Sequence, residues 1–75
     1  MKENRDYPAL VKDVRRQLAL SQEDLARALG VSYATINRWE NGQVRPSKLG
    51  KAQFNAFCAG KIQQGKLNLP QGIPD

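Results

Sequence analysis

The amino-acid sequence predicts a small all-α domain built from four helices, or from five. Its 75 residues suffice for one domain, near the length at which a single hydrophobic core becomes marginal. Along several segments, apolar residues recur every three or four positions, which is the helical period. Serine residues precede these segments and glycine residues follow some of them, as is typical of helix ends. We expect the folded domain to span 7–60, with flexible ends at 1–6 and 61–75.

The first two helices are indicated by apolar periodicity and by the residues at their ends. The first is predicted over 8–20, with Pro8 in the first turn, where a backbone N–H is not needed. Ser21 is expected to cap the second helix, and Asp24 takes the place of glutamate in the capping-box spacing. The second helix should end before Gly30, because glycine readily adopts the left-handed conformation that follows many helices.

Two more helices are predicted in the second half of the chain. Ser32 is expected to cap a third helix that ends at Asn41, and Ser47 to cap a fourth that reaches Ala59 or a few residues beyond. Four side chains of the fourth helix should complete the core: Leu49, Phe54, Phe57 and Cys58. The stretch 66–75 contains two prolines and one glycine, so we expect it to be extended or disordered.

Charge is distributed unevenly along the chain. The formal net charge is +5, from 12 Lys and Arg against 7 Asp and Glu. Residues 1–40 hold seven basic and six acidic side chains, whereas residues 41–74 hold five basic ones and no acidic one. A basic surface suits a polyanion, and nucleic acid is the usual one. The net charge by itself fits an ordinary soluble surface equally well.

Several function classes are disfavoured by what the sequence lacks. The chain has no histidine, the commonest general base and metal ligand, and no glycine-rich phosphate loop, so we expect no enzyme, cofactor or metal. The single cysteine, Cys58, is expected to be a small buried side chain in a reducing compartment. No apolar run is long enough to span a membrane, and no signal peptide is apparent, so we expect a cytoplasmic protein.

The segment from Gln22 to Trp39 predicts a helix-turn-helix corner. Two short helices joined by three or four residues around a glycine can pack at a steep angle. Ala26 would lie where the helices approach most closely, because a larger side chain would separate them, and Gly30 would make the turn. Six residues of suitable size are expected to form the core of this corner: Leu25, Ala26, Leu29, Val31, Ile36 and Trp39.

The outer face of the third helix favours DNA as the partner of this corner. With Ile36 facing inward, the helical period places small, amide and guanidinium side chains on the opposite face and no acid among them. Arg can bind guanine, Asn can bind adenine, and Ala can contact the thymine methyl group. An ordinary solvated helix would be expected to mix glutamate with lysine on that face. An αα-corner in a small bundle that binds protein is the alternative.

From Leu20 to Gly42 the sequence reads LSQEDLARALGVSYATINRWENG, and this stretch resembles the helix-turn-helix family of phage repressors and Cro-like (Xre) proteins. The resemblance implies a bacterial or phage origin. It also implies that 32–41 is a recognition helix lying in the major groove of double-stranded DNA. Four residues of that helix are then expected to read the bases: Tyr33, Ala34, Asn37 and Arg38. For Tyr33, contact with the DNA backbone is an equal alternative.

Around this helix, contacts to DNA phosphates are expected from seven residues: Gln22, Ser32, Thr35, Asn41, Arg45, Lys48 and Lys51. Gln22 begins a helix, where the helix dipole attracts an anion. The basic residues after the recognition helix could equally be ordinary surface charges. The resemblance also implies an ion pair between Arg15 and Glu40, which would be structural because an unpaired inward-facing charge is costly.

These features lead to one expected function and two alternatives. We expect a sequence-specific transcriptional regulator, a repressor that binds a palindromic operator as a homodimer on DNA. An antitoxin or a restriction-controller protein that regulates its own operon would use the same domain. The third reading is a helical protein-interaction module. Many family members continue with two short helices, whereas one longer helix is predicted from Ser47, so the usual dimer surface is in doubt. Ile62 is a candidate for self-association.

Overall fold

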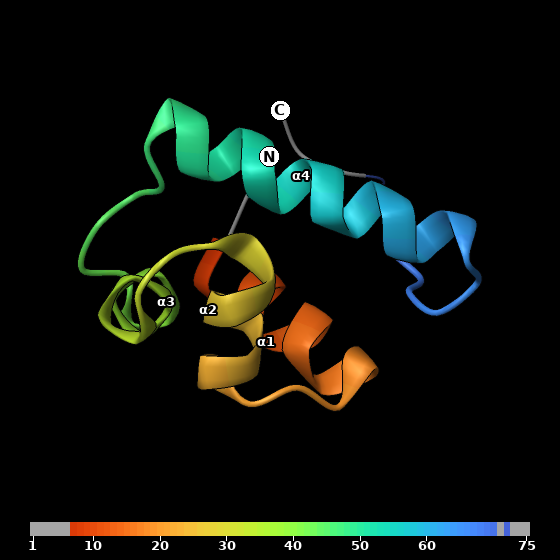
Figure 1. Cartoon of the computed structure of the whole chain (residues 1–75), viewed down its shortest axis with the longest axis horizontal. Helices are drawn as coiled ribbons and strands as arrows, with labels where there is room; N and C mark the ends of the chain where they lie inside the picture. Colours follow the sequence, from red (N-terminus) through yellow and green to blue (C-terminus); the bar gives the residue numbers. More distant parts are fainter. Residues whose placement is uncertain (1–6, 71, 73–75) are drawn as a thin grey trace.

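The computed structural model describes residues 7–70 and 72, and within them the chain forms four helices and no strand. These are α1 (Tyr7–Leu18), α2 (Gln22–Leu29), α3 (Tyr33–Asn41) and α4 (Lys48–Gln63). The prediction of a small all-α fold is therefore confirmed, with four helices and no fifth among the described residues. In Figure 1, α3 lies beside α1 and α2 at one end of the molecule, and α4 runs along one side of the other helices.

Serine caps and glycine turns set the limits of the helices after α1. Three serine side chains each accept a hydrogen bond from the backbone N–H three residues further on: Ser21, Ser32 and Ser47. At Ser21 the capping box is complete, because the Asp24 carboxylate also accepts from the Ser21 backbone N–H at 3.0 Å. Gly30 and Gly42 follow α2 and α3 in the left-handed conformation.

The end of α1 differs from the prediction, because the helix stops at Leu18 and not at Leu20. Ala19 takes a left-handed conformation with φ 57°, and the Leu20 N–H bonds the carbonyl of Arg15 at 2.9 Å. This is the hydrogen-bond pattern with which many helices end in a glycine, here made by alanine. The cost of that conformation for alanine is about 1 kcal/mol, so surrounding contacts must hold the turn.

A single core joins the four helices around Phe54 of α4. The Phe54 ring is fully buried, 5.8 Å from the ring of Tyr7 and 6.4 Å from that of Trp39. Ten apolar side chains are buried in this core: Val11, Val14, Leu25, Ala26, Leu29, Ile36, Trp39, Phe54, Cys58 and Leu67. Burial raises the pKa of Cys58 to about 12, so its thiol stays protonated.

The prediction of a core position is wrong for Leu49, whose side chain is 70% exposed. The buried face of α4 consists of Gly50, Phe54 and Cys58, four residues apart. Leu49 precedes Gly50 by one position and is therefore rotated about 100° away from this face. Phe57 is half-buried against the core, as a flank of the same face.

The segment after α4 lies closer to the core than the sequence predicts. The helix ends at Gln63, a few residues beyond Ala59 as predicted, and the chain then turns back along the molecule, past the domain boundary expected at 60 (Figure 1). Leu67 is buried and Leu69 is half-buried against the core. The side chain of Gln17 both donates to the Asn68 carbonyl and accepts from its N–H, each at 2.9 Å. The N-terminal stretch 1–6 lies outside the described residues, as do 71 and 73–75.

Candidate nucleic-acid interface

The corner between α2 and α3 combines a tight turn with buried apolar side chains. The N–H of Val31 bonds the Ala26 carbonyl at 3.0 Å across the left-handed Gly30, which ends α2, and the Ala26 side chain is buried. Five of the six expected core residues of the corner are buried, while Val31 is half-buried at its edge. Because this packing fixes the inner side of α3, the opposite side of the helix is left facing solvent.

The four base-reading candidates lie on this outer side of α3. Tyr33 is 52% exposed, and Ala34 and Arg38 are exposed as well. Asn37 is half-buried because it faces the start of α2, where its Nδ2 donates to Oε1 of Gln22 at 3.3 Å. The outer side of α3 therefore presents an aromatic, a methyl and a guanidinium group, with the amide of Asn37 at its edge.

The one acidic residue of α3, Glu40, is buried against α1 and is not part of the exposed surface. Its carboxylate is buried and accepts two hydrogen bonds from Arg15 of α1, from Nε at 2.7 Å and from Nη2 at 2.9 Å. Burial by itself would raise the pKa of Glu40, but hydrogen bonds from Arg15 and Gln22 and the Arg15 charge lower it below its ordinary value. The carboxylate is therefore ionised and neutralised within the protein.

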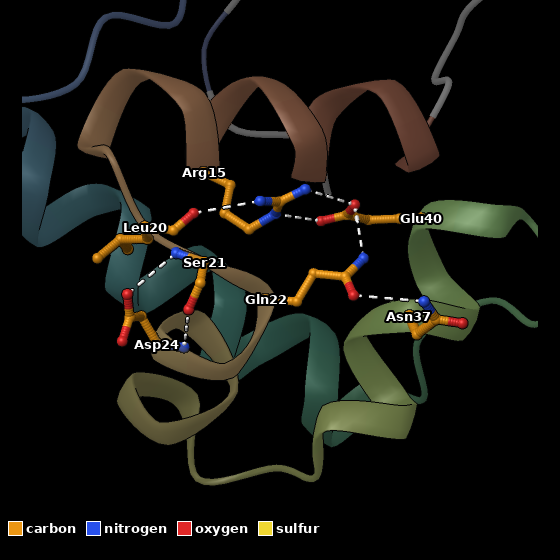
Figure 2. A network of polar contacts seen from close by, with 7 residues as sticks. All are labelled: Arg15, Leu20, Ser21, Gln22, Asp24, Asn37 and Glu40. Atoms are coloured by element: carbon orange, nitrogen blue, oxygen red, sulfur yellow. Dashed lines mark hydrogen bonds and ion pairs between the residues drawn. The ribbon is translucent and has the colours of Figure 1, made fainter.

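Arg15 also fixes the turn between α1 and α2. Its Nη1 donates to the carbonyl of Leu20 at 3.2 Å, next to the left-handed Ala19 (Figure 2). The hydrogen bonds to Glu40 raise the pKa of Arg15 above its ordinary value, so the guanidinium stays charged. One side chain thus connects α1, the turn before α2, and α3.

Gln22 contacts two residues of α3, which the sequence analysis did not predict. Its Nε2 donates to Oε1 of Glu40 at 3.0 Å, and its Oε1 accepts from Asn37 (Figure 2). Asn37 in turn accepts from Nδ2 of Asn41 at 3.0 Å. Spacing along the sequence could not show these contacts, because Gln22 lies fifteen residues before Asn37 and meets it only through the corner.

The remaining phosphate candidates fall into two groups along the sequence. Ser32 and Thr35 lie at the first turn of α3, where their hydroxyl groups are 2.9 Å apart and Ser32 also caps the helix. The second group follows α3 in sequence: Arg45 and Lys48 are exposed, and Lys51 is half-buried on α4. The first group would offer hydroxyl groups to an approaching phosphate, and the second would offer cationic groups.

Other kinds of site are not apparent in the described part of the chain. Across residues 7–70 and 72, the cysteine and carboxylate side chains form no cluster that could hold a metal ion. No helix among these residues combines the length and the apolar character needed to cross a membrane.

Comparison with known proteins points to the same segment. The profile of the helix-turn-helix family matches residues 11–49, which is more than half of the chain. A relative is the Type II methyltransferase M1.ScrFI of Lactococcus lactis subsp. cremoris, which is 44% identical over 43 residues. The match covers 53% of this chain and 11% of the methyltransferase, so the chain spans about a tenth of that relative's length. No solved structure matches the chain significantly.

Proposed function

This chain belongs to the helix-turn-helix family, in its phage repressor and Cro-like (Xre) branch, and we propose that it is a sequence-specific regulator of transcription. As a member of this family it is a DNA-binding domain. The finer proposal is that α3 lies in the major groove and that the bound protein represses a promoter. In this proposal the chain binds DNA and catalyses no reaction on it.

One observation carries the proposal: the solvent-facing side of α3 has no acidic group. The carboxylate of α3 belongs to Glu40, which is buried and paired with Arg15, whereas Arg38 and Asn41 are exposed. DNA carries a phosphate charge about every 1.7 Å of helix axis, so an exposed acid here would be repelled. A protein-binding corner has no such requirement.

The proposed mechanism divides the contacts into two classes. Arg38 and Asn37 would form hydrogen bonds with base edges, and Tyr33 and Ala34 would contact bases beside them. Gln22, Ser32, Thr35, Asn41 and the basic residues after α3 would bind phosphates and fix the register of the helix. Two copies with their α3 helices about 34–36 Å apart would read a palindrome in successive major grooves.

Selection of bound sequences from a random pool of duplex DNA tests this proposal. The wild-type protein should enrich one motif, and Arg38→Ala should lose preference at one base pair of each half-site. An exposed lysine outside the interface serves as the control, so Lys66→Ala should enrich the wild-type motif. If the wild-type protein enriches no motif even at low salt, sequence-specific regulation is wrong and a protein-binding corner becomes the better interpretation.

A second candidate function is favoured by the methyltransferase relative. Similarity to a Type II methyltransferase is consistent with a regulator of a restriction-modification operon, or with the DNA-binding part of such an enzyme. The motif from the selection discriminates between these functions. A motif that occurs upstream of the protein's own operon would support the autoregulator, and a motif found at unrelated promoters would favour the general repressor.

A further inference from the structure

Three side-chain amides form a chain of hydrogen bonds that ends at Glu40. Asn41 donates to Asn37, Asn37 donates to Gln22, and Gln22 donates to the carboxylate of Glu40. Every amide therefore points its NH₂ group toward Glu40 and its oxygen toward the outer end of the chain. A single orientation is repeated three times, from the buried ion pair to the exposed end of α3.

The chemistry of Glu40 explains why this orientation is the only stable one. An ionised carboxylate can only accept hydrogen bonds, so Gln22 must present its NH₂ group to it. The Gln22 oxygen must then face Asn37, which has to offer its own NH₂ group, and the same condition passes to Asn41. Reversing any one amide would place two oxygens or two NH₂ groups against each other.

The hydrogen bonds from Arg15 fix the position of the Glu40 carboxylate, at which this series of amide hydrogen bonds ends. The guanidinium donates to both carboxylate oxygens and also to the Leu20 carbonyl, so the carboxylate cannot rotate without breaking several bonds. The Glu40 side chain is 2% exposed, so water has little access to replace Gln22 as a donor. The amides further out are progressively more exposed, from half-buried Gln22 and Asn37 to exposed Asn41.

We propose that Glu40 is a positioning residue for DNA reading, which acts through Gln22 to hold the amide of Asn37 in one orientation. The inference rests on the proposed function, in which Asn37 meets a base edge. With its orientation set, Asn37 presents one N–H and one oxygen lone pair to the groove in a fixed order. An adenine presents the complementary pair of groups, whereas an amide free to rotate would tolerate other bases.

A merely structural role for Glu40 makes a different prediction. Loss of the Arg15–Glu40 pair would then lower the folded fraction, and binding to every DNA sequence would weaken by one factor. A positioning role instead changes the preference at the base pair read by Asn37 and leaves the other positions of the motif in place. The relative preference at each position therefore separates the two roles.

The test is selection from a random duplex pool with a set of matched variants. Asn37→Ala identifies the base pair that Asn37 reads. Gln22→Met interrupts the chain and leaves the Arg15–Glu40 pair intact, so this variant should fold even if Glu40→Gln does not. Glu23→Gln, an exposed acid one residue further along α2, is the control for a change of charge.

We expect Gln22→Met and Glu40→Gln to reduce the preference at the Asn37 base pair about tenfold, with the preferences at other positions unchanged. The control Glu23→Gln should keep the wild-type preference at every position. In the double variant Gln22→Met/Asn37→Ala, the preference at that base pair should be the same as in Asn37→Ala alone. Because Gln22 is also a proposed phosphate contact, Gln22→Met should weaken binding to all sequences as well. An unchanged relative preference at the Asn37 base pair in this variant would overturn the inference while leaving the proposed function intact. If the wild-type protein selects no motif, both fall together.

Discussion

The corner of α2 and α3 and the segment that begins with α4 enclose the same core by different means. The corner is marked at each boundary by local residues: the capping box of Ser21, the left-handed Gly30 and the Ser32 cap. The C-terminal segment has local signals only at the two ends of α4, the Ser47 cap and the left-handed Gly65, whose N–H bonds the Ile62 carbonyl at 3.0 Å. Beyond α4 it is attached through distant partners, with Leu67 in the core and Asn68 bonded to Gln17, 51 residues earlier.

This difference indicates which parts of the molecule can adjust independently. The corner places the proposed DNA-reading side chains, and its polar chain from Arg15 to Asn41 requires helix positions that are accurate to a fraction of an ångström. The stretch after α4 covers the core at some distance from α3 (Figure 1). Substitutions in that stretch should therefore change stability with little effect on base preference, whereas substitutions in the corner should affect both.

The largest effect is expected from one pair of leucine substitutions. Leu25→Ala in the corner should lower the free energy of unfolding by about 3–4 kcal/mol, because a fully buried side chain leaves a cavity between fixed helices. Leu67→Ala should cost about 2 kcal/mol, since the extended segment can move inward to fill the space. Urea denaturation followed by tryptophan fluorescence measures both. Equal losses would show that the segment is held as rigidly as the corner.

Removal of the Arg15 side chain tests the polar side of the corner. Arg15→Met leaves the Glu40 carboxylate buried without its ion-pair partner, which costs about 2–3 kcal/mol for a partner that is itself partly exposed. The double variant Arg15→Met/Glu40→Leu should recover part of this loss, because no charge is left buried. The same denaturation measurement applies. A single variant as stable as the wild-type protein would refute a stabilising role for the pair.

Two glycines of α4 differ in their contact with the corner, because Gly50 packs against Trp39 and Gly60 has open space beside it. A Cβ atom on Gly50 would lie 3.0 Å from Cζ2 of the buried Trp39, whereas a Cβ on Gly60 would meet nothing within 4 Å. Gly50→Ala should therefore destabilise by about 1 kcal/mol, and Gly60→Ala should stabilise by about 0.5–1 kcal/mol through helix propensity. Thermal melting by circular dichroism should move in opposite directions for the two variants.

The smallest predicted effect is a dependence of stability on pH. Because the pKa of Glu40 is lowered in the folded protein, its contribution to stability is present above the ordinary pKa of about 4.3 and is lost as pH falls through the folded value. The urea midpoint should fall as the pH is lowered from about 5 to about 3, and should fall less in Glu40→Gln. An equally steep fall in that variant would assign the effect to other carboxylates, of which Asp24 is the first to test. Hydrogen bonds from Ser21 lower its pKa as well.

Much of the corner could be predicted because its signals are local. Ser21, Gly30 and Ser32 act on the backbone within three residues of their own positions, so a short window of sequence contains cause and effect. Leu67 and Leu69 were missed because prolines and a glycine dominate that stretch. Leu67 and Leu69 alternate with the polar Asn68, which is the period of a half-buried extended segment. This alternation is the sequence signal that could have predicted their burial.

The sequence by itself determined the four helices, the steep corner and an outer face of α3 without acids, because helix caps and apolar periodicity act over one or two turns. The tertiary structure alone decided the contacts that cross the chain. Gln22 meets Glu40 and Asn37 because α3 folds back across the start of α2. Leu49 is exposed because α4 is rotated to place Gly50 against Trp39. Such contacts depend on the relative positions of whole helices, which no local pattern specifies.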